Sequence, residues 1–271
     1  MMSNDLAERG LVLLGCGKMG SAMLQGWLAD GLPPTSVHVI DPFPSEWLQA
    51  QGVNINADLP AAPAIALIAV KPQMMGDALP ALRAMAGGET LFVSVAAGVT
   101  LASYEAVLGD SCPIIRAMPN TPAAVGRGIT ALIGNTRVNP DQMALAEGLL
   151  QAVGQTVRLD NEDQMDAVTG VSGSGPAYVF HLIETLAAAG AAQGLPADLA
   201  LKLARATVGG AGVLAEEADD SPTQLRVNVT SPNGTTQAAL EVLMDEETGF
   251  PALLKRAVKA ATDRSKELSN G

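Results

Sequence analysis

The chain has few basic residues, few aromatic residues and two cysteines, and these scarcities limit what it can be. Its 271 residues include 16 Lys and Arg against 28 Asp and Glu, a formal net charge of -12. This balance argues against a nucleic-acid partner, because phosphates require basic patches. Aromatic residues make up 3% of the chain and hydrophobic residues 48%, so the core must be built from Ala, Leu and Val.

The chain has too few cysteines for a disulfide-linked protein, and its apolar runs are too short for a membrane-spanning one. Cys16 and Cys112 cannot form a disulfide framework, and no Cys/His cluster has metal-ligand spacing, so we predict two reduced thiols and no metal. Runs such as AIALIAV (64–70) are far shorter than the ~20 residues that cross a bilayer. The polar start MMSNDLAERG lacks the features of a secretion signal. We expect a soluble, cytoplasmic protein with no membrane partner.

The first half of the chain alternates apolar, β-branched segments with helix-like stretches, and a further helix is expected near 140–152. The strand-like segments are LVLLG (11–15), VHVID (37–41), AIALIAV (64–70), TLFVSVA (90–96), PIIRAM (113–118), ITALIG (129–134) and TVRLD (156–160). Such alternation predicts βαβ units and an α/β, Rossmann-type domain, with a parallel sheet and helices on both faces.

After Asp160 the strand-like runs stop and apolar residues recur with a helical period. Helices are expected near 162–169, 175–193, 197–218, 222–229, 234–246 and 250–269. The sequence therefore predicts two domains, a dinucleotide-binding domain over residues 1–160 and an all-helical domain over residues 161–271.

The segment LVLLGCGKMG has the G-x-G-x-x-G spacing where a strand ends and a helix begins. Gly15 permits the tight turn, Gly17 lets the backbone approach a pyrophosphate, and Gly20 lets the helix pack on the strand. Asp41 stands where an acid accepts a hydrogen bond from the adenosine ribose, which favours NAD(H) over NADP(H). The competing interpretations are a plain glycine turn, and a turn that begins at Asp41.

Three further motifs follow in a fixed order: RAMPNTPAAVGRG (116–128), GVSGSGPAYVF (170–180) and VTSPNGTTQAAL (229–240). With the fingerprint, they resemble the pyrroline-5-carboxylate reductase family over nearly the whole chain. SGSGPAY and SP-x-GTT are the specific motifs. The resemblance implies reduction of the C=N bond of Δ1-pyrroline-5-carboxylate to L-proline by NADPH or NADH, the last step of proline biosynthesis.

The Pro-Asn-Gly turn before the last motif's helix exposes backbone N–H groups that suit a carboxylate. The resemblance implies that Thr235 and Thr236 bind the substrate carboxylate, and that the Thr236 hydroxyl lies near the imine nitrogen as the catalytic group. The other implied substrate-binding residues are Asn228, Ser231 and Gly234. The competing interpretation is that Thr235 and Thr236 only cap a helix.

The resemblance also implies a set of cofactor-binding residues in the turns of the first domain and at the start of the second. They are Gly15, Cys16, Gly17, Lys18, Met19, Gly20, Asp41, Asn56, Ala69, Val70, Lys71, Pro72, Ala96, Ala97, Gly98, Asn120 and Glu162. Many family members carry Ser or Asn followed by Arg after the second strand, which suits NADPH. This chain has Asp41 and Pro42 there, so the two cofactors remain alternatives.

Two features of the family bear on the helical half. The motif GVSGSGPAYVF resembles the turn and first helix of that half, in which we expect Ser172 and Ser174 to satisfy exposed N–H groups. The family forms dimers through its helical domain, and some members assemble into decamers, so a homodimer or decamer is implied. Asn233 replaces the family's commoner glycine, which Asn tolerates because it adopts left-handed conformations.

Two rival functions share this plan. A 3-hydroxyacid dehydrogenase would use a lysine on the first long helix after the sheet domain, and residues 170–190 contain none. A non-enzymatic nucleotide-sensing protein would have a degraded substrate turn, whereas SPNGTT is intact.

Overall fold

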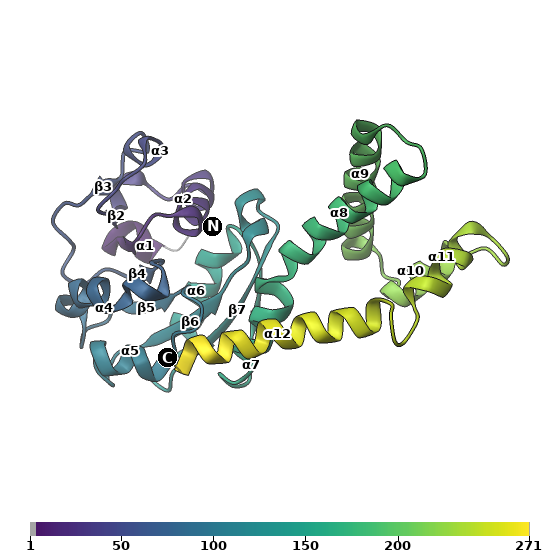
Figure 1. Cartoon of the computed structure of the whole chain (residues 1–271). Helices are drawn as coiled ribbons and strands as arrows, with labels where there is room; N and C mark the ends of the chain where they lie inside the picture. The colour runs from purple at the N-terminus through teal and green to yellow at the C-terminus, as the bar shows by residue number, and fades with distance from the viewer. Residues whose placement is uncertain (1–3, 271) are drawn as a thin grey trace. The chain divides into compact units, whose positions relative to one another are not determined.

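The computed structural model describes residues 4–270 and divides the chain into two compact units (Figure 1). The first unit comprises the chain up to Gly173 together with the residues from Ala261 onward. The second unit comprises Ser174–Ala260. No helix in the described part of the chain is both long enough and apolar enough to span a membrane.

The first unit contains an eight-stranded sheet in the order β3-β2-β1-β4-β5-β6-β7-β8. Neighbouring strands are parallel except β6 and β7. Their bounds are β1 Leu11–Leu14, β2 Val37–Ile40, β3 Asn54–Ile55, β4 Ile65–Ile68, β5 Leu91–Ser94, β6 Ile114–Met118, β7 Gly128–Gly134 and β8 Gly154–Arg158. The strand order reverses between β1 and β4, which creates a switch point where ligands bind in open α/β sheets.

The central strands are buried on both faces, as expected for a parallel sheet covered by helices. Alternate residues of β1 point to opposite faces and belong to two separate apolar clusters. Leu13 packs in one cluster with Trp27 and Leu149, and Val12 packs in the other with Tyr104. These clusters require a helical layer on each face of the sheet.

Three helices of the first unit, α3, α5 and α6, begin at a residue whose side chain caps the helix. At the start of α6, the Asn139 side chain accepts a hydrogen bond from the Gln142 N–H, and the Gln142 side chain accepts one from the Asn139 N–H, which forms a capping box. At the start of α5, the Thr100 side chain accepts a hydrogen bond from the Ser103 N–H. The α-helices are α1 Asn4–Arg9, α2 Lys18–Ala29, α3 Glu46–Gln49, α4 Met75–Ala78, α5 Leu101–Leu108, α6 Pro140–Gln151 and α7 Gln164–Val168. The 3-10 helices are η1 Pro34–Ser36, η2 Pro72–Met74, η3 Leu79–Met85 and η4 Thr121–Val125.

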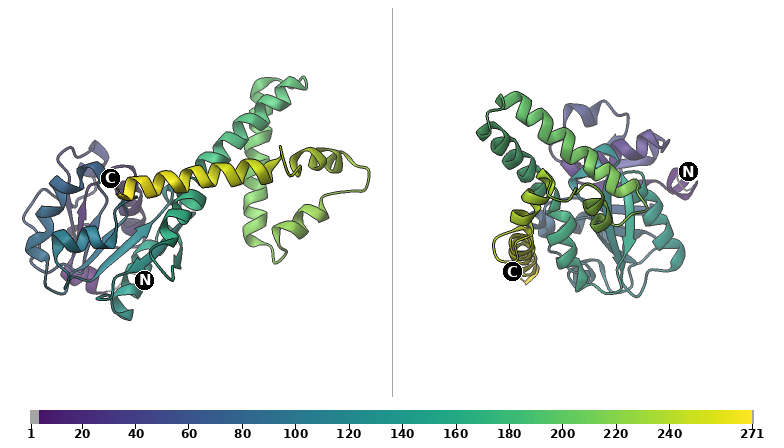
Figure 2. Two further views of the ribbon diagram at one scale, coloured as in Figure 1. Left: turned by 60° about the horizontal axis from the view of Figure 1, so that its bottom comes forward. Right: turned by 90° about the vertical axis from the view of Figure 1, so that its right-hand side faces the viewer.

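The second unit consists of helices. They are α8 Gly175–Ala192, α9 Ala197–Glu217, α10 Pro222–Asn228, α11 Thr235–Leu243 and α12 Phe250–Asn270, of which α12 continues into the first unit. The long helices α8 and α9 pack on one another (Figure 2, green). A Cβ added at Gly190 would touch Ala200 at 3.4 Å, which shows how closely the two backbones approach there.

The expected strands and helices are present within a few residues, with two differences in the sheet. β3 was not predicted, because its two residues are too short to show a periodic pattern. β7 runs antiparallel to β6, whereas a parallel sheet was expected. Residues 119–127 are too short for the crossover that a parallel neighbour requires.

The compact units divide between Gly173 and Ser174, later than the expected domain boundary at residue 160. The segment after 160 packs with the sheet unit: Met165 of α7 is buried, and Asp166 accepts a 2.6 Å hydrogen bond from Ser265 of α12. The division into functional domains 1–160 and 161–271 stays a prediction.

Candidate dinucleotide and substrate sites

The three glycines of the fingerprint differ in what surrounds them. Gly15 has φ +87°, and a Cβ there would lie 2.8 Å from the Val70 Cγ1. A Cβ at Gly20 would lie 2.5 Å from the Gly15 carbonyl oxygen. Gly17, by contrast, has nothing within 4 Å of its Cβ position. The fold therefore requires glycine at 15 and 20, while the space beside Gly17 is open to a ligand.

Helix α2 begins at this open position. Gly17 is its N-cap and provides no side-chain cap, so the N–H groups of the first turn point out of the helix end without an intrahelical acceptor. Such an end attracts phosphate, through its N–H groups and the positive end of the helix dipole. Lys18 lies exposed in the first turn, and Met19 packs against the core below.

Asp41 holds the glycine-rich turn in place. Its Oδ2 accepts a 2.8 Å bond from the Cys16 N–H, and its Oδ1 accepts a 2.8 Å bond from the Phe43 N–H. Each carboxylate oxygen keeps a second lone-pair direction for a further donor. Asp41 therefore organises its own turn, as one interpretation expected, and still has capacity for the ribose hydroxyls.

The Cys16 thiol takes no part in acid-base chemistry at this turn. Burial of the thiol raises the pKa of Cys16 to about 11, and the negative charge of Asp41 makes a smaller contribution in the same direction. The thiol is therefore neutral near pH 7, and the contribution of Cys16 is its backbone N–H.

Asn56 follows β3 and fixes the backbone of Asp41. Its Nδ2 donates to the Asp41 carbonyl at 2.7 Å, and its Oδ1 accepts from the Asp41 N–H at 2.9 Å. Asn56 adopts φ +50°, a left-handed conformation that Asn tolerates better than most residues. The structure thus places Asn56 beside Asp41, with both ends of its amide bonded to backbone.

The loops after β4 and β5 lie at the same sheet edge as the glycine-rich turn. The register pairs Leu14 with Ile68 and Ile68 with Ser94, so these three strands end side by side. Ala69, Val70, Lys71 and Pro72 follow β4, and Ala96, Ala97 and Gly98 follow β5. The sequence-predicted cofactor residues of these three loops are therefore brought together.

The loop after β5 is braced from several directions. Ser94 Oγ accepts from the Ala96 N–H at 3.2 Å and is also hydrogen-bonded to the Tyr104 hydroxyl. Burial raises the pKa of Tyr104 to about 12, so this hydroxyl keeps its proton. A Cβ at Gly98, which has φ +74°, would lie 3.1 Å from the Leu268 Cβ. The loop has little freedom to move.

Glu162 bonds to the start of α5 and to a buried arginine. Its Oε1 accepts from the Leu101 N–H at 2.9 Å and from Arg116 Nη1 at 2.7 Å. The Arg116 side chain is 4% exposed, and its Nη2 is a buried nitrogen without a hydrogen-bond partner. Glu162 thus supports the loop that carries Ala96, Ala97 and Gly98, and its direct contact with a cofactor stays a prediction.

Sequence reasoning missed Arg116 as a member of this group. The available signal was a cation inside the otherwise apolar strand segment IIRAM, since a buried charge requires a partner. Asn120, two residues after the same strand, is buried and accepts a 3.0 Å bond from the Ile129 N–H.

The predicted substrate turn lies in the second unit, at the start of α11. Asn233 has φ +58°, so the expectation that this position requires a left-handed residue is confirmed. Its N–H donates to the Gln237 Oε1 at 2.8 Å, and the Gly234 N–H donates to the Ser231 carbonyl at 3.0 Å. Gly234 is the N-cap without a side-chain cap, which leaves the N–H groups of Thr235 and Thr236 to an external acceptor.

Asn228, at the end of α10, lies in a polar cluster of its own unit. Its Nδ2 donates to the Asp220 Oδ2 at 3.0 Å, and its Oδ1 accepts from the Gln224 Nε2 at 2.7 Å. All five predicted substrate residues are in the second unit, and all the predicted cofactor residues are in the first.

The glycine-serine motif departs from its expected hydrogen bonds. Residues Thr169–Gly173 form a π-helical turn, and the Ser172 hydroxyl donates to the Val168 carbonyl at 3.1 Å instead of capping an N–H group. Ser174 is the N-cap of α8 but makes no side-chain cap. The expectation for these two serines was wrong, because the π turn continues the helical backbone from α7 into α8 and neither serine side chain caps an N–H group.

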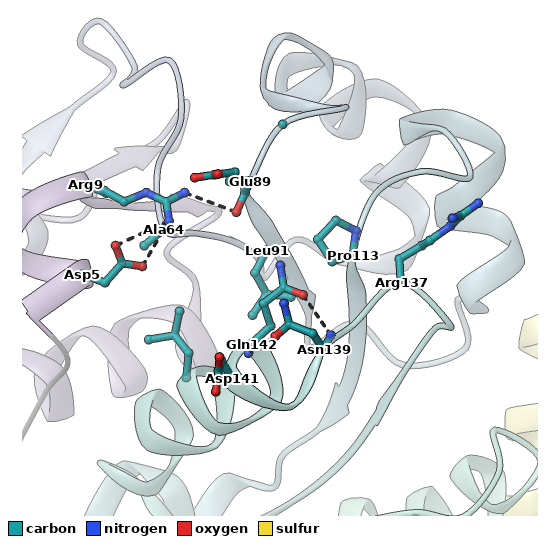
Figure 3. Close-up of a pocket in the computed structure, with 12 residues that line it drawn as sticks. Asp5, Arg9, Ala64, Glu89, Leu91, Pro113, Arg137, Asn139, Asp141 and Gln142 are labelled. Atoms are coloured by element: carbon teal, nitrogen blue, oxygen red, sulfur yellow. Dashed lines mark hydrogen bonds and ion pairs between the residues drawn. The ribbon is translucent and has the colours of Figure 1, made fainter.

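A pocket of about 560 Å³ lies at the amino ends of the parallel strands, opposite the ends that carry the glycine-rich turn (Figure 3). It is lined by residues that precede the parallel strands, among them Ala64 and Pro113, and by Arg137, which follows the antiparallel β7. The Arg9 guanidinium donates hydrogen bonds there to the Asp5 carboxylate and to the carbonyl oxygens of Ala62, Pro63 and Glu89. The pocket contains none of the predicted site residues, and its arginine clamp holds α1 to two loops.

Over residues 4–270, no group of three or more His, Cys, Asp or Glu side chains is arranged to hold a metal ion. The predicted site residues offer backbone N–H donors, small residues, amides, hydroxyls, the amines of Lys18 and Lys71 and the carboxylates of Asp41 and Glu162. This set suits the binding of a dinucleotide and of a small anion.

Two family models match the chain, one for each half. Residues 10–98 match "NADP oxidoreductase coenzyme F420-dependent", and residues 162–268 match "Pyrroline-5-carboxylate reductase dimerisation". The chain is 40% identical to a pyrroline-5-carboxylate reductase of Pseudomonas aeruginosa over 96% of both chains. It is 43% identical to the enzyme of that name from Synechocystis over 95% of this chain and 97% of the other.

Solved structures agree with these relatives. A pyrroline-5-carboxylate reductase from Coxiella burnetii superposes with a TM-score of 0.89 at 36% identity, covering 96% of this chain and 98% of that one. A Plasmodium falciparum pyrroline carboxylate reductase with NADP bound gives a TM-score of 0.85 at 28% identity, covering 97% of this chain and 99% of the other.

Proposed function

The chain belongs to the pyrroline-5-carboxylate reductase family, and from this premise we propose that it reduces 1-pyrroline-5-carboxylate to L-proline with a nicotinamide cofactor. The observation that carries the proposal is 40% identity to a named reductase along 96% of both chains. The open glycine-rich turn and the intact SPNGTT turn agree with it. The relatives favour this function over a 3-hydroxyacid dehydrogenase or a nucleotide sensor, and it is the final step of proline biosynthesis.

The residues of the first unit fit a dinucleotide. The open space at Gly17 and the free N–H groups at the start of α2 suit the pyrophosphate, and the Asp41 carboxylate suits the adenosine ribose. We assign the loops after β4 and β5 to the nicotinamide half. When bound, the reduced nicotinamide supplies a hydride for the imine carbon.

The substrate turn supplies what this reaction needs from the protein. The free N–H groups of Thr235 and Thr236 hold the ring carboxylate at the positive end of α11. The Thr236 hydroxyl then lies near the imine nitrogen, accepts a hydrogen bond from the iminium N–H and so orients the ring. After hydride addition has left a neutral amine, the hydroxyl passes a proton from solvent to the amine nitrogen. The iminium already carries the positive charge that draws the hydride, so the enzyme needs no strong acid. Asn228, Ser231 and Gly234 complete the substrate set.

We further propose that NADH is the preferred cofactor. The Asp41 carboxylate repels an added 2′-phosphate and accepts bonds from a free 2′-hydroxyl. The following residues PFPSEW offer no Arg or Lys to hold that phosphate. NADP is bound in the Plasmodium falciparum relative, so the preference of this chain rests on its own Asp41.

Self-association is supported by the match to the dimerisation model over residues 162–268. We propose a homodimer formed by the helical unit, whose long helices expose many leucines and valines. Assembly into a decamer and a cytoplasmic location stay predictions.

Oxidation of NADH and of NADPH, followed at 340 nm with the imine present and absent, tests the function. We expect oxidation that requires the imine and is faster with NADH at equal concentrations. Absence of imine-dependent oxidation with either cofactor would contradict the proposed activity, and faster oxidation of NADPH would contradict the role given to Asp41.

A further inference from the structure

We propose that Phe43 is the adenine-binding residue of the dinucleotide site, with its phenyl ring stacked on the base. Phe43 is 88% exposed, more than any other large apolar residue among residues 4–270. It stands two residues after Asp41, at the carboxyl end of β2. The inference deepens the proposed function, because it rests on a nucleotide bound at this edge of the sheet.

A single exposed apolar residue is common and by itself indicates nothing. Phe43 differs because its backbone is tied to the ribose-binding candidate: its N–H donates to the Asp41 Oδ1 at 2.8 Å. Asp41 is in turn fixed by Asn56, which bonds to both its N–H and its carbonyl. The exposed ring therefore stands on a backbone whose position is set relative to the Asp41 carboxylate.

The residues that follow hold the segment from the other side. Pro42 and Pro44 flank Phe43 and restrict the backbone of this segment. Ser45 caps α3 through the Leu48 N–H at 3.2 Å, and the Gln49 Nε2 donates to the Pro44 carbonyl at 3.1 Å. A side chain presented by so constrained a turn loses little entropy on binding, which is the condition for a preformed aromatic surface.

The chemistry of the ligand connects the two side chains. Adenine is attached to the same ribose whose hydroxyls suit the Asp41 carboxylate, so a nucleotide held there brings its base into the neighbourhood of Phe43. Every base offers a π-face, and an aromatic ring beneath it gains stacking energy without requiring a particular hydrogen-bond pattern. The nearby Trp47 does not offer the same surface, because it packs against the core.

Titration calorimetry with ADP-ribose and with 2′-phospho-ADP-ribose tests the inference on the full-length protein. Both probes carry the adenosine end and the pyrophosphate but no nicotinamide. We expect Phe43→Ala to raise the Kd of the tighter probe about tenfold, and Phe43→Trp to keep it near the wild-type value. Val157→Ala, at an exposed valine of β8, is the matched control and should leave the Kd unchanged.

Reduced nicotinamide mononucleotide, which lacks adenine, separates stacking from a general disturbance of the site. Its Kd should be the same in wild type and Phe43→Ala. An unchanged Kd for both adenosine probes in Phe43→Ala would overturn the inference, as would equal losses for the adenosine probes and the mononucleotide. Failure of the wild type to bind either adenosine probe would overturn it too.

The binding experiment and the activity assay can fail independently of one another. Phe43-dependent binding of ADP-ribose without imine-dependent oxidation would leave the inference standing and remove the reductase. Imine-dependent oxidation together with adenosine binding that does not change in Phe43→Ala would keep the reductase and remove the role of Phe43.

Discussion

The two units of the molecule differ in how far each one buries its own apolar surface. In the sheet unit, two apolar clusters cover both faces of the central strands. Among the described residues of the helical unit, the buried hydrophobic residues are Ala200 and Ala204. Many leucines of this unit are exposed, and Leu203, for example, is 48% exposed. The sheet unit therefore carries a complete core, and the helical unit needs a further apolar surface to complete its own.

The difference also divides the chemistry. The sheet unit positions its candidate ligand groups through bonds among buried or constrained residues, as at Asp41 and Glu162. The helical unit presents backbone N–H groups at the start of α11, and the direction of these groups follows from the helix geometry. Substitutions should therefore affect binding through local contacts in the first unit, and affect assembly and turnover in the second.

The largest effect is expected from a charge on the exposed apolar face of α9. Leu203→Asp should raise the dissociation constant of the dimer by about a hundredfold or more, because an unpaired carboxylate would be buried in the interface. Light scattering coupled to size exclusion measures the mass at several concentrations. Val157→Asp in the sheet unit is the control, and an unchanged mass for Leu203→Asp would place the interface elsewhere.

The next effect concerns turnover at the substrate turn. Thr236→Ala should lower kcat by about a hundredfold, in the range typical of a lost proton-transfer group, while Tm changes little. Thr236→Ser keeps the hydroxyl and should recover much of the rate. Wild-type kcat in a folded Thr236→Ala would remove the hydroxyl from the mechanism.

The fingerprint glycines separate fold from binding within the sheet unit. Gly20→Ala should destabilise the protein by about 1–3 kcal/mol, because its Cβ would lie 2.5 Å from the Gly15 carbonyl oxygen. Gly17→Ala meets no atom within 4 Å and should leave Tm near wild type while weakening dinucleotide binding. Chemical denaturation and calorimetry give the two quantities, and equal Tm values for both variants would contradict the distinction.

A smaller and more selective effect is expected at Asp41. Asp41→Ser should shift the ratio of kcat/KM values toward NADPH, because the charge that repels the 2′-phosphate is removed. It should also lower affinity for both cofactors, since the Cys16 N–H loses its carboxylate acceptor. If the ratio stays the same while both affinities fall, Asp41 acts on the turn alone.

The smallest effect is the acid sensitivity of an ion pair between α6 and β8. The hydrogen bond from Arg158, 2.6 Å from Nε to Oε1, holds the pKa of Glu147 below its usual value. A lowered folded-state pKa contributes stability above the unfolded pKa, near 4.3, and this contribution disappears as the pH falls through the folded value. Glu147→Gln should cost less than about 1 kcal/mol at pH 7, and urea denaturation should show this cost shrinking steadily as the pH falls below the unfolded value.

The sequence predicted most of the fold because its signals are local. Glycine spacing at a strand end and the change of period after Asp160 each depend on neighbouring residues. The antiparallel β7 and the packing of α7 and α12 with the sheet unit depend on contacts between distant segments. No local pattern carries that information.

The candidate site divides in the same way. The crowding at Gly15 and Gly20 and the open space at Gly17 agree with the motif, and the left-handed conformation of Asn233 was expected from the residue type. The bonds from Asn56 to Asp41 and from Arg116 to Glu162 join residues far apart in the chain, and only the three-dimensional structure reveals them. The exposure of Phe43 was likewise invisible in the sequence, where an aromatic between two prolines has no periodic partner.

The most direct test of the assigned chemistry follows the hydride itself. Incubation of the protein with the imine and a cofactor carrying deuterium at both C4 positions, followed by mass spectrometry and NMR of the product, locates the transferred atom. We predict L-proline with one deuterium on its δ-carbon, the former imine carbon, and a matching amount of oxidised cofactor. Proline without deuterium, or cofactor oxidation without proline, would contradict it.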